Sequence, residues 1–196
     1  MTFKKYVLAA AVMAVMSGSA MAVDAPSDTG TITFHGLVNS GTCLITMPDD
    51  FTQDGNDFDV QLETVQVADF AANTKSANSV TSTLGETPFK LHVQCDVSKN
   101  IESVSAQLDP WAGSSAGNEG ILVPASNLQG AATNVALVLR NGVGGDQIKM
   151  GQANGGTATA LVNGAADLNY AVAYTGPSTA SSGKVQAQVA FTMDYE

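Results

Sequence analysis

The last fourteen residues of the chain, Gly183 to Glu196, alternate between apolar and polar side chains almost without exception. The apolar positions share one parity and are Val185, Ala187, Val189, Phe191, Met193 and Tyr195. The positions between them are polar, apart from Ala190. Because successive side chains of a strand point to opposite faces, this pattern predicts a half-buried β-strand that runs to the end of the sequence. Its apolar face must be covered, either by the rest of the chain or by another molecule.

A second alternating segment begins at Gly30 and ends a few residues before Cys43. The residues of one parity are Gly30, Ile32, Phe34, Gly36 and Val38, and those of the other parity are polar except for Leu37. This pattern also predicts a strand. Leu37 leaves the register open at the C-terminal end of the segment, since a slip of one residue turns every side chain to the other face.

Shorter alternating runs recur along the chain with turn-forming residues between them. Their apolar positions are Phe58, Val60 and Leu62; Phe89, Leu91, Val93 and Cys95; Val135, Leu137 and Leu139; and Leu168, Tyr170, Val172 and Tyr174. The segments 111–120 and 151–164 are rich in Gly, Ala, Ser and Asn and are predicted to be surface loops. Residues 69–75 can form one helical turn, but no helical period is sustained. The sequence therefore predicts an all-β sandwich or barrel.

The first 22 residues have the organisation of a secretory signal peptide. Lys4 and Lys5 precede an apolar run that is too short to span a bilayer, and Ala20-Met21-Ala22 forms a small-residue cleavage site. We expect a mature chain that starts at Val23 and is exported without membrane insertion. Its 6 Lys and Arg against 18 Asp and Glu give a formal charge of −12. Such an acidic surface argues against nucleic acid as a partner.

Cys43 and Cys95 are the two cysteines of the chain. In an exported protein the default expectation is that they form a disulfide. A loop of about 50 residues closed in this way stabilises the fold by roughly 4 kcal/mol in the chain-entropy model.

No group of residues forms a credible active site, and no cofactor is expected. His35 and His92, the two histidines, lie on the polar parity of their predicted strands, which favours outward-facing residues over a metal or catalytic role. Residues 50–61 resemble a calcium loop only in part, and an acidic connector is the preferred interpretation. Trp111 is either a sugar-stacking residue or a loop anchor.

Four features taken together resemble the pilins of the chaperone-usher pathway, and in particular the major subunits of type 1-like fimbriae. They are the signal peptide, the sequence GTITFHGLVNSGTC, a second cysteine about fifty residues further on, and a terminal strand with Gly183 and a penultimate Tyr195. The resemblance covers the mature chain, although residues 65–164 match only in pattern.

The resemblance implies an immunoglobulin-like sandwich that lacks its last strand, with residues 39–196 as the pilin domain. The segment 23–38 is then a donor strand, with Gly30, Ile32, Phe34, Gly36 and Val38 entering the groove of a neighbouring subunit. The groove is bounded by the terminal strand, Gly183 and Val185 to Tyr195. A periplasmic chaperone occupies the groove first and holds the Glu196 carboxylate with basic residues, and an outer-membrane usher organises the exchange.

Two alternatives remain at this point. Residues 30–38 can be an ordinary first strand of the chain's own sandwich. The protein can also be a minor tip or adaptor pilin, or a small secreted carbohydrate-binding module, in place of the repeated shaft subunit. A secreted enzyme is disfavoured because the sequence has no catalytic constellation.

Overall fold

A computed structural model describes residues 30–36, 43–47, 52–54, 57–72, 83–150 and 158–196 of the 196-residue chain. For the segments 30–36 and 52–54 the description extends to the backbone only. The predicted signal peptide, 1–22, and Val38 lie outside the described residues.

The described residues form strands with few helical turns. In chain order the elements are β1 (Gly30–Gly36), β2 (Cys43–Thr46), β3 (Thr52–Asp54), β4 (Asp57–Gln61), α1 (Val67–Ala72), β5 (Leu84–Cys95), η1 (Val97–Lys99), β6 (Ser103–Trp111), β7 (Ser115–Ala116), η2 (Asn118–Gly120), β8 (Leu122–Val123), β9 (Ala136–Arg140), β10 (Gln147–Ile148), β11 (Thr159–Ala160), β12 (Ala165–Thr175) and β13 (Val185–Tyr195).

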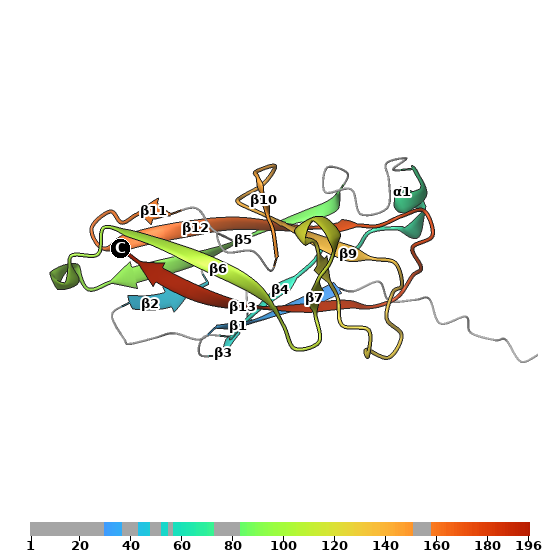
Figure 1. The fold of residues 1–196 in the computed structure, drawn as a ribbon, viewed down its shortest axis with the longest axis horizontal. Coiled ribbons are helices and arrows are strands. Elements are labelled where there is room, and N and C mark those ends of the chain that lie inside the picture. Colours follow the sequence, from blue (N-terminus) through green and yellow to red (C-terminus); the bar gives the residue numbers. More distant parts are fainter. Residues whose placement is uncertain (1–29, 37–42, 48–51, 55–56, 73–82, 151–157) are drawn as a thin grey trace, which may run out of the picture.

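The strands form two sheets that pack face to face (Figure 1). One sheet has the order β11-β6-β13-β1-β4-β3, and the other has the order β2-β5-β12-β9-β8-β7, with β10 paired to β9. Every pairing between named strands is antiparallel except that of β1 with β13, which is parallel. The prediction of an all-β, immunoglobulin-like sandwich is confirmed.

The core lies between the sheets and is built from the alternate residues of the long strands. In β13 every second residue from Val185 to Met193 is buried, and the same holds for β5 from Phe89 to Cys95. Each sheet contributes one aromatic pair to the core: the rings of Phe58 and Phe191 are 6.0 Å apart in the first sheet, and those of Phe89 and Tyr170 are 5.4 Å apart in the second. The apolar parities predicted for these strands are therefore the buried faces.

Two parts of the fold differ from the sequence prediction. Strand β6 lies in a region for which no strand was predicted, although Val104, Ala106 and Leu108 alternate there with polar residues and are buried. Strand β9 was predicted to have one apolar face, but Ala136 and Val138 on its other face are also buried, in a small cluster with Ile121. The segments predicted as loops contain the short strands β7 and β11.

The single α-helix among the described residues, α1, has 6 residues and carries the helical turn expected near Asp69. None of the helices in this part of the chain is long and apolar enough to cross a bilayer. In Figure 1, α1 lies at one end of the long axis of the sandwich, and β2, η1 and the C-terminus lie at the other end. We call these the α1 end and the disulfide end.

Candidate functional site

The terminal strand β13 is the central feature of the site, because it joins the two halves of its sheet. It pairs with β6 on one side, where Phe191 is the Cα partner of Leu108, and with β1 on the other. Its inward residues Val185, Ala187, Val189, Phe191 and Met193 are buried, as predicted. Tyr195 is half-buried at the end of the same face.

Strand β1 lies between β13 and β4 of its own chain. On the β13 side, the predicted donor residues Gly30, Ile32, Phe34 and Gly36 are the Cα partners of the buried residues Val185, Ala187, Val189 and Phe191. On the β4 side, Ile32 and Phe34 are the partners of the buried residues Val60 and Phe58. The same parity that the sequence predicted as apolar is thus in register with the core positions of both neighbours.

The register also shows what β1 covers. No direct pairing joins β13 to β4 among the described strands, so the connection between them runs through β1. Gly36 is opposite Phe191 and contributes no side chain there, while the ring of Phe191 stacks on Phe58 at an interplanar angle of 29°. Removing β1 would therefore open one sheet beside β13 and expose the edge of the hydrophobic core.

Gly183 positions the start of β13. The amide of Lys184 donates to the carbonyl of Gly130 at 2.8 Å, and the carbonyl of Lys184 accepts from the amide of Ala132 at 2.9 Å. A Cβ atom on Gly183 would lie 2.5 Å from the Ala132 nitrogen and 2.7 Å from the Ala131 carbonyl carbon, and the φ of Gly183 is +154°. Only glycine allows the backbone at 130–132 to approach this closely.

A half-open apolar cavity of about 30 Å³ lies beside Gly183, at the α1 end of β13. Val65, Val67 and Phe70 line it from α1 and the residues just before it, Ala132 and Val135 line it from the segment that precedes β9, and Tyr174 lines it from β12. The sequence analysis did not identify this cavity, because its walls come from segments with no common periodicity.

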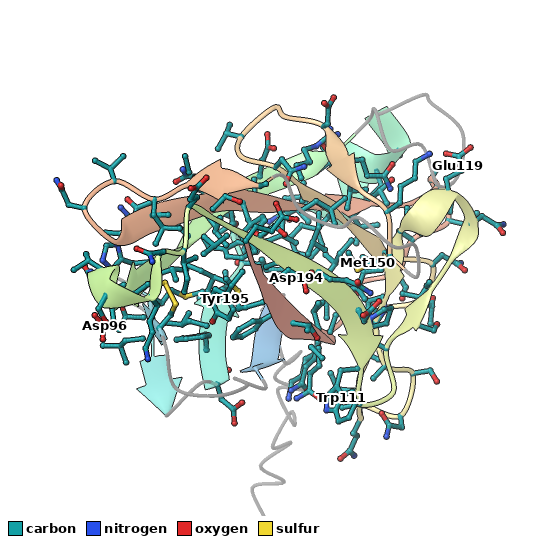
Figure 2. The ribbon with its side chains drawn as sticks, turned by 60° about the vertical axis from the view of Figure 1, so that its left-hand side comes forward. Asp96, Trp111, Glu119, Met150, Asp194 and Tyr195 are labelled. Carbon is teal, nitrogen blue, oxygen red and sulfur yellow. A yellow bond between two sulfur atoms is a disulfide. The ribbon has the colours of Figure 1, made fainter. Side chains whose placement is uncertain are left out.

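At the other end of β13 the C-terminal residue is bound to its own chain. An oxygen of the Glu196 main-chain carboxyl group accepts from the amides of Glu102 at 2.6 Å and Ser103 at 2.9 Å. The Tyr195 hydroxyl is buried and has no hydrogen-bond partner, and burial raises the pKa of Tyr195. Figure 2 shows Tyr195 on the side of the molecule where the disulfide lies.

The disulfide between Cys43 and Cys95 is present, as the sequence predicted. The two residues are Cα partners in the pairing of β2 with β5, and both are buried. The bond therefore joins the first strand after β1 to the body of the second sheet.

The other candidates from the sequence have no catalytic arrangement. His92 faces outward, as expected, and its Nδ1 lies 2.6 Å from Asp167, whose other oxygen lies 3.1 Å from the Lys90 ammonium group. The hydrogen bonds from His92 and then from Lys90 hold the pKa of Asp167 below its ordinary value. No cluster of three potential metal ligands occurs among the residues that the structure describes, and part of the calcium-like segment 50–61 lies outside them.

Trp111 is the last residue of β6 and is 55% exposed, so it does not anchor a loop in the core. Figure 2 shows its ring far along β6 from Tyr195. His35 lies in β1 as the Cα partner of Asp57, and its side chain is outside the description.

Comparisons with known proteins agree on one family. The family model described as "Fimbrial protein" matches residues 32–196. The major fimbrial subunit SMF-1 of Stenotrophomonas maltophilia (strain K279a) is 31% identical over 173 residues, which cover 85% of this chain and 92% of that protein.

Two solved structures have a similar fold. The P pilus rod subunit PapA has a TM-score of 0.52 at 12% identity, covering 78% of this chain and 99% of that one. A subunit from the structure of a chaperone-usher pilus has a TM-score of 0.52 at 17% identity, covering 83% of this chain and 93% of that one. At these identities the structural likeness concerns the fold alone.

Proposed function

The chain belongs to the fimbrial protein family and is a structural subunit of a surface fimbria, not an enzyme. From this premise we propose that it polymerises by strand exchange. The segment 23–38 leaves its own chain and enters the groove beside β13 of a neighbouring subunit. There it replaces the neighbour's β1, which has moved on to a third subunit. Residues 39–196 form the body that remains in place.

The observation that carries this proposal is the register of β1. It pairs along its whole length with β13 and over residues 31–35 with β4, and its alternate residues are in register with buried residues of both strands, while residues 37–42 connect it along the chain to β2. A strand added to a sheet edge in this way contributes main-chain hydrogen bonds and places alternate side chains in core pockets. Burying Ile32, Phe34 and Val38 contributes about 4.5 to 9 kcal/mol before ordering costs, at about 1.5 to 3 kcal/mol per side chain.

The direction of the donated strand follows from the geometry of a filament. Within one chain β1 runs parallel to β13 and ends near Phe191, at the disulfide end, where Cys43 begins the body. A released arm therefore extends outward from the disulfide end. If the neighbour has the same orientation along the fibre, the arm runs antiparallel to the neighbour's β13. An arm parallel to the neighbour's β13 would place the disulfide end of the donor against the disulfide end of the acceptor. The two subunits would then have opposite orientations, and the same contact could not be repeated along a fibre.

Each subunit in this arrangement is a donor to one partner and an acceptor for another. Such a head-to-tail contact is heterologous and generates an open filament when it does not close into a ring. The partners implied are therefore identical or related pilin subunits.

The open groove of a subunit that has not yet polymerised must be covered during export, and we assign this role to a periplasmic chaperone, with an outer-membrane usher at the site of exchange. The end of β13 suits such a partner. The Tyr195 hydroxyl is a buried donor with no acceptor, and the Glu196 carboxyl group accepts hydrogen bonds from two backbone amides, which carry no formal charge. A basic side chain beside Glu196 would supply the missing charge.

Deletion of residues 23–38 tests the proposal. The deleted chain keeps all the residues of the body, so it should bind its chaperone and accept a donor strand. It should not join onto a preceding subunit, and in cells that produce only this variant electron microscopy should find no fibres. Normal fibres from the deletion variant would refute strand donation.

A further inference from the structure

The exposed apolar side chains of the chain are not scattered at random. Leu44, Val97 and Val162 are 63%, 69% and 71% exposed. They belong to β2, to η1 and to the connection between β11 and β12, which Figure 1 shows at the disulfide end. The other two large exposed apolar residues among those described, Trp111 and Val143, lie elsewhere. Large apolar side chains that gather on one surface mark an interaction site more often than single ones do.

The three side chains surround one tight turn. Val162 and Ala165 close this turn through two backbone hydrogen bonds of 2.8 and 3.1 Å. Within it, Gly164 has a φ of +80°, and a Cβ atom there would lie 2.8 Å from the side chain of Val97. Leu44 is the Cα partner of Gln94, whose side chain donates to the Gly164 carbonyl at 3.2 Å. We call Leu44, Val97 and Val162 the end patch.

The α1 end of the sandwich has a concave apolar surface. The cavity beside Gly183 is half open and is walled by Val65, Val67, Phe70, Ala132 and Val135. Val65, Val67, Ala132 and Val135 are only partly buried, so they remain accessible from outside the α1 end. The chain thus has a protruding apolar surface at one end of its long axis and a hollow one at the other.

Strand donation brings these two surfaces together. The donated arm ends at Val38 of the donor, and strand β2 of the donor's body begins at Cys43, next to Leu44. The four residues between Val38 and Cys43 allow a separation of at most about 18 Å when fully extended. Because the arm runs antiparallel to the acceptor's β13, its last residues lie near Val185, beside the cavity. The disulfide end of the donor is therefore held close to the α1 end of the acceptor.

We propose that the end patch of each subunit packs against the α1 end of the next subunit, around the cavity beside Gly183, as a second contact beside the donated strand. The partner is another copy of this chain. This inference rests on the proposed strand donation, and it adds a surface that the exchange itself does not require. A joint with both contacts resists bending as well as separation, whereas a joint held by the arm alone would be a flexible tether.

Aspartate substitutions test the contact without disturbing the core, because the side chains of the end patch are exposed. In fibres built from the full-length chain, Val97→Asp with Val162→Asp should raise the rate of subunit release in warm detergent on the order of a hundredfold, about tenfold for each apolar side chain that is no longer buried. Val143→Asp is the matched control, since Val143 is 65% exposed but lies in the turn between β9 and β10. Equal release rates for the double variant and the control would overturn the proposal.

Chemical cross-linking gives a second, independent test. Val97→Cys and Val67→Cys lie at opposite ends of one subunit, so a short bis-maleimide can join them only between subunits. Fibres of this double variant should give a covalent ladder on a reducing denaturing gel. No ladder, or an equal ladder from Val143→Cys with Val67→Cys, would contradict the contact. Failure of the strand-donation proposal has a different signature, namely normal fibres from the chain that lacks residues 23–38.

Discussion

Replacing Gly183 by alanine is predicted to weaken the fold at the start of β13. The new Cβ would lie 2.5 Å from the Ala132 nitrogen and 2.7 Å from the Gly130 oxygen, and both of these are backbone atoms that cannot rotate away. The segment 130–132 must shift, which strains its two hydrogen bonds to Lys184. The substitution also places a side chain at a φ of +154°.

The expected cost can be worked from these contacts. Two weakened backbone hydrogen bonds cost about 1 kcal/mol each, and an unfavourable backbone conformation costs about 1 kcal/mol more. For a domain of this size, 1 kcal/mol lowers the melting temperature by roughly 2 to 4 °C. Gly183→Ala should therefore lower the melting temperature by roughly 6 to 12 °C.

Thermal unfolding of the purified, disulfide-bonded subunit, followed by circular dichroism, measures this shift. Gly142→Ala is the matched control, because Gly142 also has a positive φ of +77° but has nothing within 4 Å of its Cβ position. The control should lose only about 1 kcal/mol, the cost of the backbone conformation alone. If both variants melt at the same temperature, the close approach of 130–132 does not explain the glycine.

Three further predictions concern the joint, the surface and the disulfide. Phe34→Asp should release subunits from fibres in detergent at a lower temperature than Phe34→Leu, because a charge in an apolar pocket costs several kcal/mol; equal temperatures would show that Phe34 is not buried in the joint. Asp167→Asn should lower the free energy of unfolding by less than about 1 kcal/mol near neutral pH, since its ion pairs are half exposed. Because the pKa of Asp167 is lowered in the fold, its contribution to the free energy of unfolding is present above the ordinary pKa of about 4 and is lost as the pH falls through the lowered value. The free energies of unfolding of the variant and the wild type, measured by urea titration, should therefore become equal in acid. Cys43→Ser with Cys95→Ser opens a loop with a sequence separation of 52 residues and should cost about 4 kcal/mol in urea, whereas an unchanged midpoint would rule out a stabilising role.

The long strands could be predicted from the sequence because each has one buried face. In β13 and β5 the alternation of apolar residues follows the burial directly, and Cys95 falls on the buried parity that its disulfide requires. The parity of β1 could be predicted for the same reason, since Ile32 and Phe34 are in register with buried residues on both sides.

Other features could not be found from periodicity alone. Strand β9 is buried on both faces, so its apolar and polar residues do not alternate. A search for alternation therefore leaves out Ala136 and Val138. Strand β6 has the alternation, but its apolar residues include the small Ala106, and Pro110 near its end suggests a turn. The cavity beside Gly183 is formed by side chains from four separate segments, which only the folded chain brings together.

The sequence also left open whether the segment 30–38 completes its own sandwich or another one. In the isolated chain β1 pairs with its own β13, in the parallel direction that the short connection to Cys43 allows. A filament of subunits with one orientation needs the opposite direction. Under the proposed strand exchange, the choice between the two states therefore depends on the presence of a neighbour, which is a property of the assembly and not of a single chain.

Strand exchange is tested most directly by asking which subunit's β13 lies beside β1 in a fibre. Thr33 is the central residue of β1 and the Cα partner of Gln188. If β1 enters a neighbouring subunit in the antiparallel direction and keeps the same centre, Thr33 lies beside Gln188 of that neighbour. In fibres of the chain with Thr33→Cys and Gln188→Cys, mild oxidation should produce a covalent ladder of subunits on a non-reducing denaturing gel, and neither single variant should do so. If fibres of normal appearance give only monomers with an internal Thr33→Cys to Gln188→Cys disulfide, each subunit keeps its own strand and the account of the joint is wrong.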